Sequence, residues 1–363
     1  MSNVIPLNVP SRRQSEGARL GALLDSFAAH RRFGDDVFWL KENAELLNIC
    51  ECTGRAVPAE ALQAHAGFMA RIAQRMEFFP QYYRFLLSIC LDVEDLAERA
   101  GLEPGTTGAE MVEWAARQGL ARAEMSDLQR AEARRLMLRR GVDPLPEDTG
   151  LAERLHRFID RSGTFQLPNK KAAYELTHIV FYLSAYGRQD PGLSDAAVAS
   201  LEYAGILAWL DQNADLLAEV CVALRYAGRQ PSEIWEDWIA TRVAGFGMVA
   251  GDGADIHDDY HEFFVSNWAL AMAGRGAFSR PVAGGAMSFH APPATVAPLR
   301  ALSDCLFRLD DRRSDDWERM RALVADTLED EGRNVLLAAE RCTERFGEFF
   351  AGFARTGLRG VAS

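Results

Sequence analysis

The sequence has 363 residues and a formal net charge of -12 at pH 7. A chain of this length forms one large domain or two ordinary ones, with a core that needs no disulfide or metal for stability. Its apolar content of 48% and charged content of 25% are typical of a globular protein, and exclude a disordered chain or a membrane bundle. The acidic balance argues against nucleic acid or an anionic membrane as a partner.

The start of the chain and its cysteines indicate a cytoplasmic protein. In residues 1–13 the positive charge follows a short apolar stretch broken by proline, which is the wrong order for a secretory signal. The longest apolar stretches, such as 179–183, are far too short to span a membrane. The six cysteines are widely spread, as is typical of reduced, buried thiols. We expect residues 1–15 to form a flexible arm.

Apolar residues recur at helical spacing along almost the whole chain. Before residue 140 the pattern predicts a helix that begins at Glu16 and further helices at about 37–50, 59–78, 81–100, 109–118 and 126–140. After residue 150 it predicts helices near 151–161, 169–186, 194–210, 212–227, 231–244, 256–273, 297–308, 315–330 and 332–356. Runs with strand periodicity are absent, so we predict an all-α fold. Residues 275–296, rich in Gly, Pro and Ala, are expected to form a long loop.

The segment 140–150 is the best candidate for a linker, because it packs two glycines, two prolines and three acids into eleven residues. We expect it to separate an N-terminal helical region, 16–140, from a C-terminal domain, 150–363. Three helices of that domain end in similar sequences before glycines at 187, 228 and 274, which are 41 and 46 residues apart. This spacing suits stacked helix pairs, in an open solenoid or a closed α/α toroid, although so weak a repeat can also arise by coincidence.

Polar residues occupy matching positions on these three helices. His178 and Glu219 lie nine residues before their glycines, and Tyr174, Asp215 and His261 lie thirteen before theirs. Positions four apart share a helix face, so neighbouring helices would bring together His178, Asp215, Glu219 and His261. Two imidazoles and two carboxylates form a ligand set for zinc, iron or manganese.

The same residues admit other interpretations. His178 has apolar neighbours and fits a core histidine bonded to a backbone carbonyl. Glu219 lies on a very apolar helix, so it must pair with a group such as Arg225 or His178, become protonated, or bind a ligand. The cluster is therefore also compatible with a metal-free acid–base pocket or with structural pairing.

Two further motifs carry less weight. His257 and His261 lie four residues apart, which resembles the H-E-x-x-H helix of zinc proteases, but an aspartate replaces the catalytic glutamate. His261, next to Val265 and Trp268 on the predicted helix, is the better ligand of the two. The sequence 245–250 fits G-x-G-x-x-A, but no strand precedes it, so we expect no nucleotide cofactor.

Four stretches together resemble an uncharacterised family of all-helical bacterial proteins, a domain of unknown function. These stretches are 38–48, 76–84, 167–184 and 211–219. The most distinctive motif is Tyr-x-Leu-Thr-His-x-x-Phe-Tyr at 174–182. The resemblance covers nearly the whole chain and implies a helical fold but no activity. It also favours a functional role for His178.

The leading hypothesis is an enzyme that uses one bound zinc, iron or manganese ion to act on a small polar substrate by hydrolysis or oxidation. The predicted metal ligands are His178, Glu219 and His261. The predicted catalytic residues are Asp215, which orients a ligand or acts as a base, and Tyr182 or Tyr260 as proton donor. The loop 275–296, with His290, is expected to close over the pocket.

Two rival functions remain open from sequence alone. A helical-repeat adaptor would bind a protein or peptide along an exposed apolar groove, with the four polar residues scattered or bonded to backbone. A metal-free pocket for an apolar or isoprenoid-like substrate would show a wide aromatic cavity with the carboxylates at its rim.

Overall fold

The computed structural model describes residues 14–32, 36–103, 105–251, 255, 257–293 and 296–356. These residues form 18 α-helices and one sheet of two short strands, so the predicted all-α class is confirmed. The predicted arm, 1–15, lies almost entirely outside the described residues. Within the described part of the chain, no helix combines the length and apolar character needed to cross a membrane.

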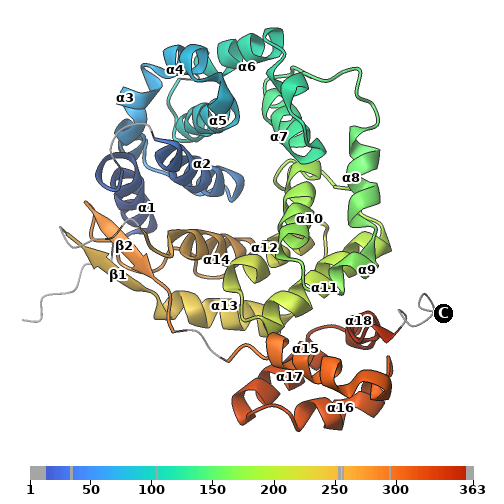
Figure 1. Ribbon diagram of the computed structural model, residues 1–363. Helices are drawn as coiled ribbons and strands as arrows, with labels where there is room; N and C mark the ends of the chain where they lie inside the picture. The colour runs from blue at the N-terminus through green and yellow to red at the C-terminus, as the bar shows by residue number, and fades with distance from the viewer. Residues whose placement is uncertain are drawn as a thin grey trace, which may run out of the picture.

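Six helices form a closed ring around the centre of the molecule (Figure 1). In chain order they are α2 (Val37–Cys52), α5 (Tyr83–Arg99), α7 (Asp127–Leu138), α10 (Lys170–Leu183), α12 (Ala214–Tyr226) and α14 (Tyr260–Met272). Each helix contacts the next, and α14 contacts α2 to close the ring. The three helices with similar C-terminal sequences are therefore consecutive members, α10, α12 and α14.

A second layer of helices surrounds the ring (Figure 1). It consists of α1 (Glu16–Asp25), α3 (Ala66–Met69), α4 (Ile72–Phe78), α6 (Thr107–Arg117), α8 (Leu151–Ile159), α9 (Ser162–Phe165), α11 (Asp195–Leu210) and α13 (Glu233–Gly245). The segment 140–150 connects α7 of the ring to α8 of the outer layer, and the residues before and after this segment each contribute three helices to the ring.

The last four helices form a lobe outside the ring (Figure 1). They are α15 (Leu299–Leu309), α16 (Trp317–Ala325), α17 (Asp330–Cys342) and α18 (Phe346–Phe353). The lobe packs on α11 and α13. Among the polar contacts that hold it there, Trp209 Nε1 donates to the carbonyl of Val335 (2.9 Å), and the Tyr203 hydroxyl donates to Glu348 Oε2 (3.0 Å).

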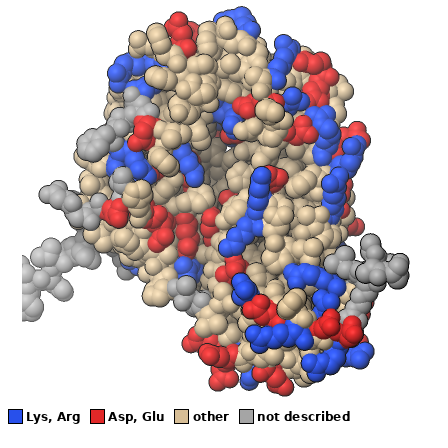
Figure 2. Space-filling view, viewed as in Figure 1, with Lys and Arg blue, Asp and Glu red and all other residues tan. Residues whose placement is uncertain are grey.

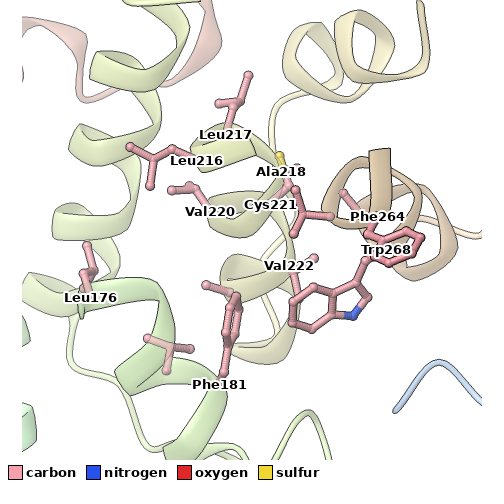
Figure 3. Close-up of a cluster of buried hydrophobic side chains, with 14 of the residues drawn as sticks. Leu176, Phe181, Leu216, Leu217, Ala218, Val220, Cys221, Val222, Phe264 and Trp268 are labelled. Atoms are coloured by element: carbon pink, nitrogen blue, oxygen red, sulfur yellow. The ribbon is translucent and has the colours of Figure 1, made fainter. Parts of the chain in front are cut away.

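The apolar sequence of α12 explains its central place. The Asn213 side chain caps its first turn, and eleven of its 13 residues are buried. A helix that is apolar on all sides has to be covered on all sides, and α12 contacts α10, α11, α13 and α14. Figure 3 shows its residues packed against Phe181 of α10 and Trp268 of α14. The acidic exceptions, Asp215 and Glu219, are thereby held in a rigid wall.

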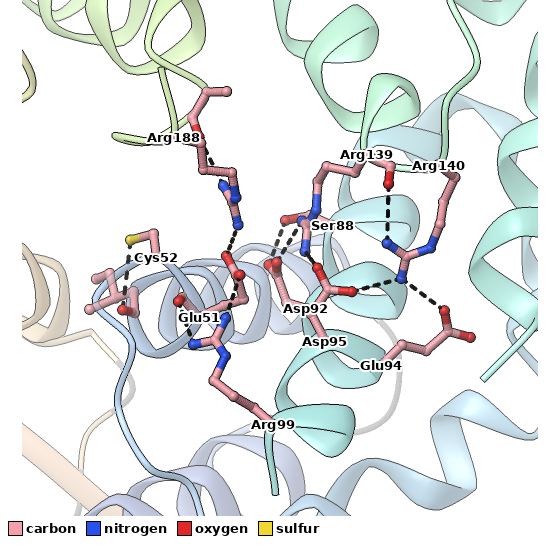
Figure 4. Close-up of polar contacts among 12 residues, drawn as sticks. Glu51, Cys52, Ser88, Asp92, Glu94, Asp95, Arg99, Arg139, Arg140 and Arg188 are labelled. Atoms are coloured by element: carbon pink, nitrogen blue, oxygen red, sulfur yellow. Dashed lines mark hydrogen bonds and ion pairs between the residues drawn. The ribbon is translucent and has the colours of Figure 1, made fainter. Parts of the chain in front are cut away.

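Arginine–carboxylate pairs join neighbouring ring helices (Figure 4). Arg139 of α7 bonds to Asp92 (2.7 Å) and Asp95 (2.6 Å) of α5. Glu51 of α2 accepts from Arg99 of α5 (2.7 Å) and pairs with Arg188, which follows α10. Because Glu51, Asp92 and Arg139 are almost fully buried, these pairs hold α2, α5, α7 and the end of α10 in fixed register.

Gly187 completes the left-handed turn after α10, which leaves the helix at Ala185 and Tyr186. Its φ is +82°, and a Cβ at this position would lie 2.5 Å from the Tyr226 ring, so no other residue fits. The glycines after α12 and α14, Gly228 and Gly274, also have positive φ. Gly228 and Gly274 directly follow the C-caps of their helices and end them as the sequence predicts, whereas α10 ends before Gly187, at Leu183.

Some predicted elements were wrong in detail. The expected loop 275–296 contains β2 (Met287–His290), which pairs antiparallel with β1 (Gly247–Ala250). Four-residue strands of this kind are too short to show a period-2 pattern. The expected helix 332–356 is divided because Thr343 is extended and its hydroxyl accepts from the Arg345 backbone N–H (3.2 Å). The expected helix 59–78 is divided into a 3-10 helix at Ala59–His65 followed by α3 and α4.

Candidate functional site

A cavity of about 290 Å³ lies at the centre of the ring. All six ring helices line it, and Figure 2 shows a hollow at the centre of the face seen in Figure 1. Its aromatic lining consists of Phe85, Phe181, Tyr182, Tyr186 and Trp268. Its charged and histidine side chains are Lys41, Glu45, Arg84, Glu132, Arg135, His178, Glu219 and His261. Its volume suits a small molecule rather than a polypeptide.

Three predicted site residues lie together beside this cavity; Glu219 and His261 line it, and Asp215 lies next to them outside the lining. Single ligand atoms from Asp215, Glu219 and His261 all lie within 4.8 Å of one another. Asp215 and Glu219 are four residues apart on α12 and so share one face of that helix. His261 reaches them from the first turn of α14, the next helix in the ring. We call these three residues the carboxylate–histidine cluster.

His261 lies between two carboxylates. Its Nδ1 is 2.6 Å from Glu45 Oε1 of α2, and its Nε2 is 3.2 Å from Asp215 Oδ1. Burial alone would lower the pKa of His261, but the two negative charges outweigh burial and raise this pKa to about 11. Without a metal ion the imidazole is therefore protonated at neutral pH.

Asp215 is held in its ionised form. Its Oδ2 accepts a hydrogen bond from the Tyr174 hydroxyl (2.8 Å). Burial favours the neutral acid, but the His261 charge and the Tyr174 hydroxyl together lower the pKa of Asp215. The other oxygen, Oδ1, is buried and, among the described residues, has no hydrogen bond of good geometry despite its closeness to His261. An ionised oxygen in this state is free to accept a further ligand.

The surroundings of Glu219 favour its neutral form, in contrast to those of Asp215. It is only 3% exposed, and this burial raises the pKa of Glu219 even though a hydrogen bond from Thr177 to Oε2 (2.6 Å) opposes the shift. His178 Nδ1 is 3.6 Å from the same oxygen. Arg225, the other partner expected from the sequence, pairs instead with Glu236 (2.6 Å).

His178 lines the cavity but lies outside the carboxylate–histidine cluster. Its Nδ1 is 2.8 Å from the Tyr174 carbonyl, an atom that can only accept, so Nδ1 carries a proton. This is the backbone bond expected of a core histidine, yet the side chain is 36% exposed. In the neutral ring Nε2 therefore keeps its lone pair. Tyr182 packs edge-on against the His178 ring at 6.0 Å and lines the same cavity.

The other expected site residues lie elsewhere. Tyr260 does not line the cavity; its ring packs among Phe27, Phe264 and Arg31. His257 precedes α14 and is exposed, so it does not share a helix face with His261. The described part of 275–296, including His290, contributes nothing to the cavity wall, so the expected lid over the site was wrong. Its strand β2 instead contacts α14.

A family model described as a domain of unknown function, DUF6902, matches residues 1–356. The chain belongs to the DUF6902 family. No curated protein and no solved structure matches it. The DUF6902 assignment agrees with the expected family resemblance and covers both halves of the ring.

Sequence reasoning missed two residues of this DUF6902 cavity, Glu45 and Arg135. Glu45 contacts a residue 216 positions away, and that contact depends on closure of the ring between α2 and α14. The sequence feature that could have indicated Glu45 is the group of polar residues on the otherwise apolar helix α2. Arg135 lies in a helix rich in arginine, where its spacing does not distinguish a buried side chain from exposed ones.

Proposed function

We propose that this DUF6902 protein is a metal-dependent enzyme that acts on a small substrate in the central cavity. The observation that carries the proposal is the carboxylate–histidine cluster, in which three ligand atoms converge and Asp215 Oδ1 is buried with no hydrogen bond of good geometry among the described residues. Three protein ligands leave a coordination position open for water or substrate, as catalytic metal sites require.

The surroundings of His261 support a metal site over simple ion pairing. A metal-binding histidine usually donates its second ring N–H to a carboxylate or carbonyl, which fixes the ring and raises the basicity of the ligating nitrogen. Glu45 provides this contact to Nδ1, and Nε2 faces the carboxylates of α12. Two carboxylates and one imidazole suit zinc, iron or manganese.

In this proposal the ion supplies Lewis-acid activation of water or of a polar substrate bond, and we assign hydrolysis as the reaction class. His178 is the proton-transfer residue, because its Nδ1 is anchored on the Tyr174 carbonyl and its Nε2 keeps a lone pair at the cavity. Tyr182, beside His178, is a second proton donor to the bound substrate.

A second candidate function needs no metal. Asp215 and Glu219 lie one turn apart, and their environments shift their pKa values in opposite directions, down for Asp215 and up for Glu219. Such a pair serves as base and acid in many active sites. The aromatic lining of the cavity would then accept an apolar substrate.

An activity screen with metal depletion distinguishes the two candidates. We expect hydrolysis of at least one class of small ester, amide or phosphoester substrate, loss of that activity after chelation, and recovery with zinc, manganese or iron(II). Asp215→Asn should stay inactive after the metal is restored. Full activity of chelated protein would overturn the metal proposal in favour of the acid–base pair.

We also propose a cytoplasmic location. All six cysteines are free, and four of them are buried. Burial raises the pKa values of Cys50, Cys52 and Cys342 to about 12, so these thiols are unreactive. Fractionation of cells that express the native protein tests the location; recovery outside the cytoplasm would contradict it.

A further inference from the structure

Arg135 differs from the other buried arginines of the ring because it has no carboxylate partner. It lies on α7, is 8% exposed, and lines the central cavity. Among the described residues its guanidinium makes no ion pair and no hydrogen bond, and its Nε is buried without an acceptor. By contrast, Arg139, one turn further along α7, bonds to two aspartates. The charge of Asp92 acts on Arg135 from beyond ion-pair distance. A buried cation that no counter-ion contacts is costly unless a ligand supplies the charge.

Aromatic rings hold Arg135 in place. Its guanidinium carbon lies 4.3 Å from the ring centre of Tyr186 and 5.5 Å from that of Tyr182. Tyr186 in turn stacks on Trp268 with an angle of 14° between the rings. Tyr186 has a φ of +57°, which is an unfavourable backbone conformation for a tyrosine. This conformation places the Tyr186 ring in the cavity wall. The fork of N–H groups is therefore fixed before any ligand binds.

Among the described residues, no carboxylate of the cavity lining lies within ion-pair distance of Arg135. Arg84 is paired with Glu124 and Glu132, and Glu45 is paired with His261. Lys41 at the cavity has no ion pair among the described residues. Glu219, the third lining carboxylate, accepts a hydrogen bond from Thr177 (2.6 Å) and lies 3.6 Å from His178 Nδ1. Arg84 and His261 each contact two carboxylates, so the cavity as a whole is not positive. An anion is favoured locally, at Arg135 and Lys41, which no carboxylate contacts among the described residues.

Resting on the proposed function, we infer that the substrate is a small organic anion with a flat apolar body. Arg135 binds its carboxylate or phosphate through paired N–H donors, and Lys41 adds charge from α2. The rings of Phe181, Tyr186 and Trp268 cover the apolar part. The reactive bond then lies toward the carboxylate–histidine cluster.

A second cavity also borders Arg135. Its other arginines all have carboxylate partners: Arg134 pairs with Asp143 (2.6 Å), Arg139 with Asp92 and Asp95, and Arg188 with Glu51. Lys41 lines the central cavity but not the second cavity, so binding in the second cavity would not depend on Lys41. Weaker anion binding by Lys41→Met would therefore place the anion in the central cavity, and unchanged binding would place it in the second cavity.

Calorimetric binding of benzoate, phenyl phosphate and neutral benzamide tests the inference, with the protein as purified and after chelation. We expect one of the anions to bind at least tenfold more tightly than benzamide in both preparations, and the tighter anion identifies the group recognised. Arg135→Met should weaken anion binding at least tenfold and benzamide binding less than twofold. Lys41→Met should weaken anion binding about threefold.

The controls separate this inference from the metal proposal. Arg134 is the neighbour of Arg135 in the sequence and is paired with Asp143. Arg134→Met removes the same charge as Arg135→Met and should bind the anions as the native protein does. Arg135→Lys keeps the charge without the fork and should give intermediate affinity, which guards against misfolding of Arg135→Met. Metal content is measured in every variant. Anion affinity that is unchanged in Arg135→Met overturns the inference even if metal is bound, and Arg135-dependent binding in metal-free protein supports it even if the metal proposal fails.

Discussion

Two histidines show how the surroundings of a residue set its chemistry. His261 lies between two carboxylates, which raise its pKa to about 11. His65, at the end of the 3-10 helix, is fully buried with no charged partner, and this burial lowers its pKa to about 4. Its Nε2–H donates to Asn43 Oδ1 (2.8 Å), while Asn43 Nδ2 donates to two backbone carbonyls and so fixes the amide orientation. His65 is therefore neutral in the folded protein.

The depressed pKa of His65 predicts a specific pH dependence of stability. An unfolded histidine has a pKa near 6.5, so between pH 6.5 and about 4 the unfolded chain binds a proton that the folded chain does not. The stabilisation is fully present above pH 6.5 and is lost as the pH falls toward 4. Of the total loss of stability between pH 7.5 and 4.5, His65 should account for roughly 2 to 3 kcal/mol.

Urea unfolding of the native protein and of His65→Gln at both pH values measures this term. The glutamine can still donate to Asn43 but does not titrate, so the variant should lose less stability on acidification. Equal losses in the two proteins would show that His65 carries no such linkage. Because other groups titrate in this range, the difference between the two proteins is the quantity to compare.

Helices with strong caps and continuous periodicity were predictable from sequence. The predicted 194–210 is observed as Asp195–Leu210, because Ser194 caps the first turn and the apolar pattern runs without a break. The helix expected at 59–78 was not predictable as three pieces, because a buried contact from His65 to another helix decides its local conformation. The split at Thr343 depends likewise on a side-chain hydrogen bond to the backbone.

Helices α11 and α13 pack so closely that a methyl group added at Gly205 should destabilise the protein. A Cβ at Gly205 of α11 would lie 2.5 Å from the ring of Trp235, which is 1% exposed. Alanine would favour the helix by about 1 kcal/mol in the absence of neighbours. The clash should outweigh this gain, so we expect Gly205→Ala to lower the free energy of unfolding by about 1 to 2 kcal/mol.

Gly347→Ala is the matched control for this prediction. Gly347 lies in α18, is exposed, and has no neighbouring atom within 4 Å of an added Cβ. Its substitution should leave the free energy of unfolding unchanged or raise it by up to about 1 kcal/mol. If denaturant unfolding shows Gly205→Ala to be as stable as the native protein, the described contact with Trp235 is wrong.

At the scale of the whole molecule, the ring depends on the seam where its first and last helices meet. Arg31 lies at this seam with a fully buried side chain. It pairs with Asp258 through two bonds of 2.8 and 2.9 Å, lies 3.3 Å from Glu42 of α2, and donates to the Met287 carbonyl of β2. One guanidinium therefore links α2, the segment before α14, and the small sheet.

Removal of Arg31 should destabilise the protein strongly. Arg31→Met leaves Asp258 buried without its cation, while Glu42 keeps its pair with Arg32 (2.8 Å), and we expect a loss of roughly 3 to 5 kcal/mol in the free energy of unfolding. Arg157→Met, which breaks the exposed pair with Glu153, should cost less than about 0.5 kcal/mol. Similar losses in the two variants, measured by urea denaturation, would contradict the role of the seam.

Ring closure also explains which part of the site could be found from sequence. Tyr174, Asp215 and His261 share one position relative to the ends of α10, α12 and α14, and their side chains do meet. Glu45 was out of reach, because no local pattern indicates that α2 would return beside α14. Arg135 was missed for a different reason: its neighbours Tyr182 and Tyr186 come from the adjacent α10 and the turn after it, and no pattern on the arginine-rich α7 marks which side chain they cover.

The metal content of the purified protein tests the central claim most directly. Elemental analysis of untagged protein prepared without chelator should find close to one equivalent of zinc, iron or manganese. His261→Gln should lose this ion. His178→Gln, which alters a histidine outside the carboxylate–histidine cluster, should keep the ion while losing activity. Native protein that holds no metal and takes none up from micromolar solutions, or a His261→Gln variant that retains a full equivalent, would contradict the account.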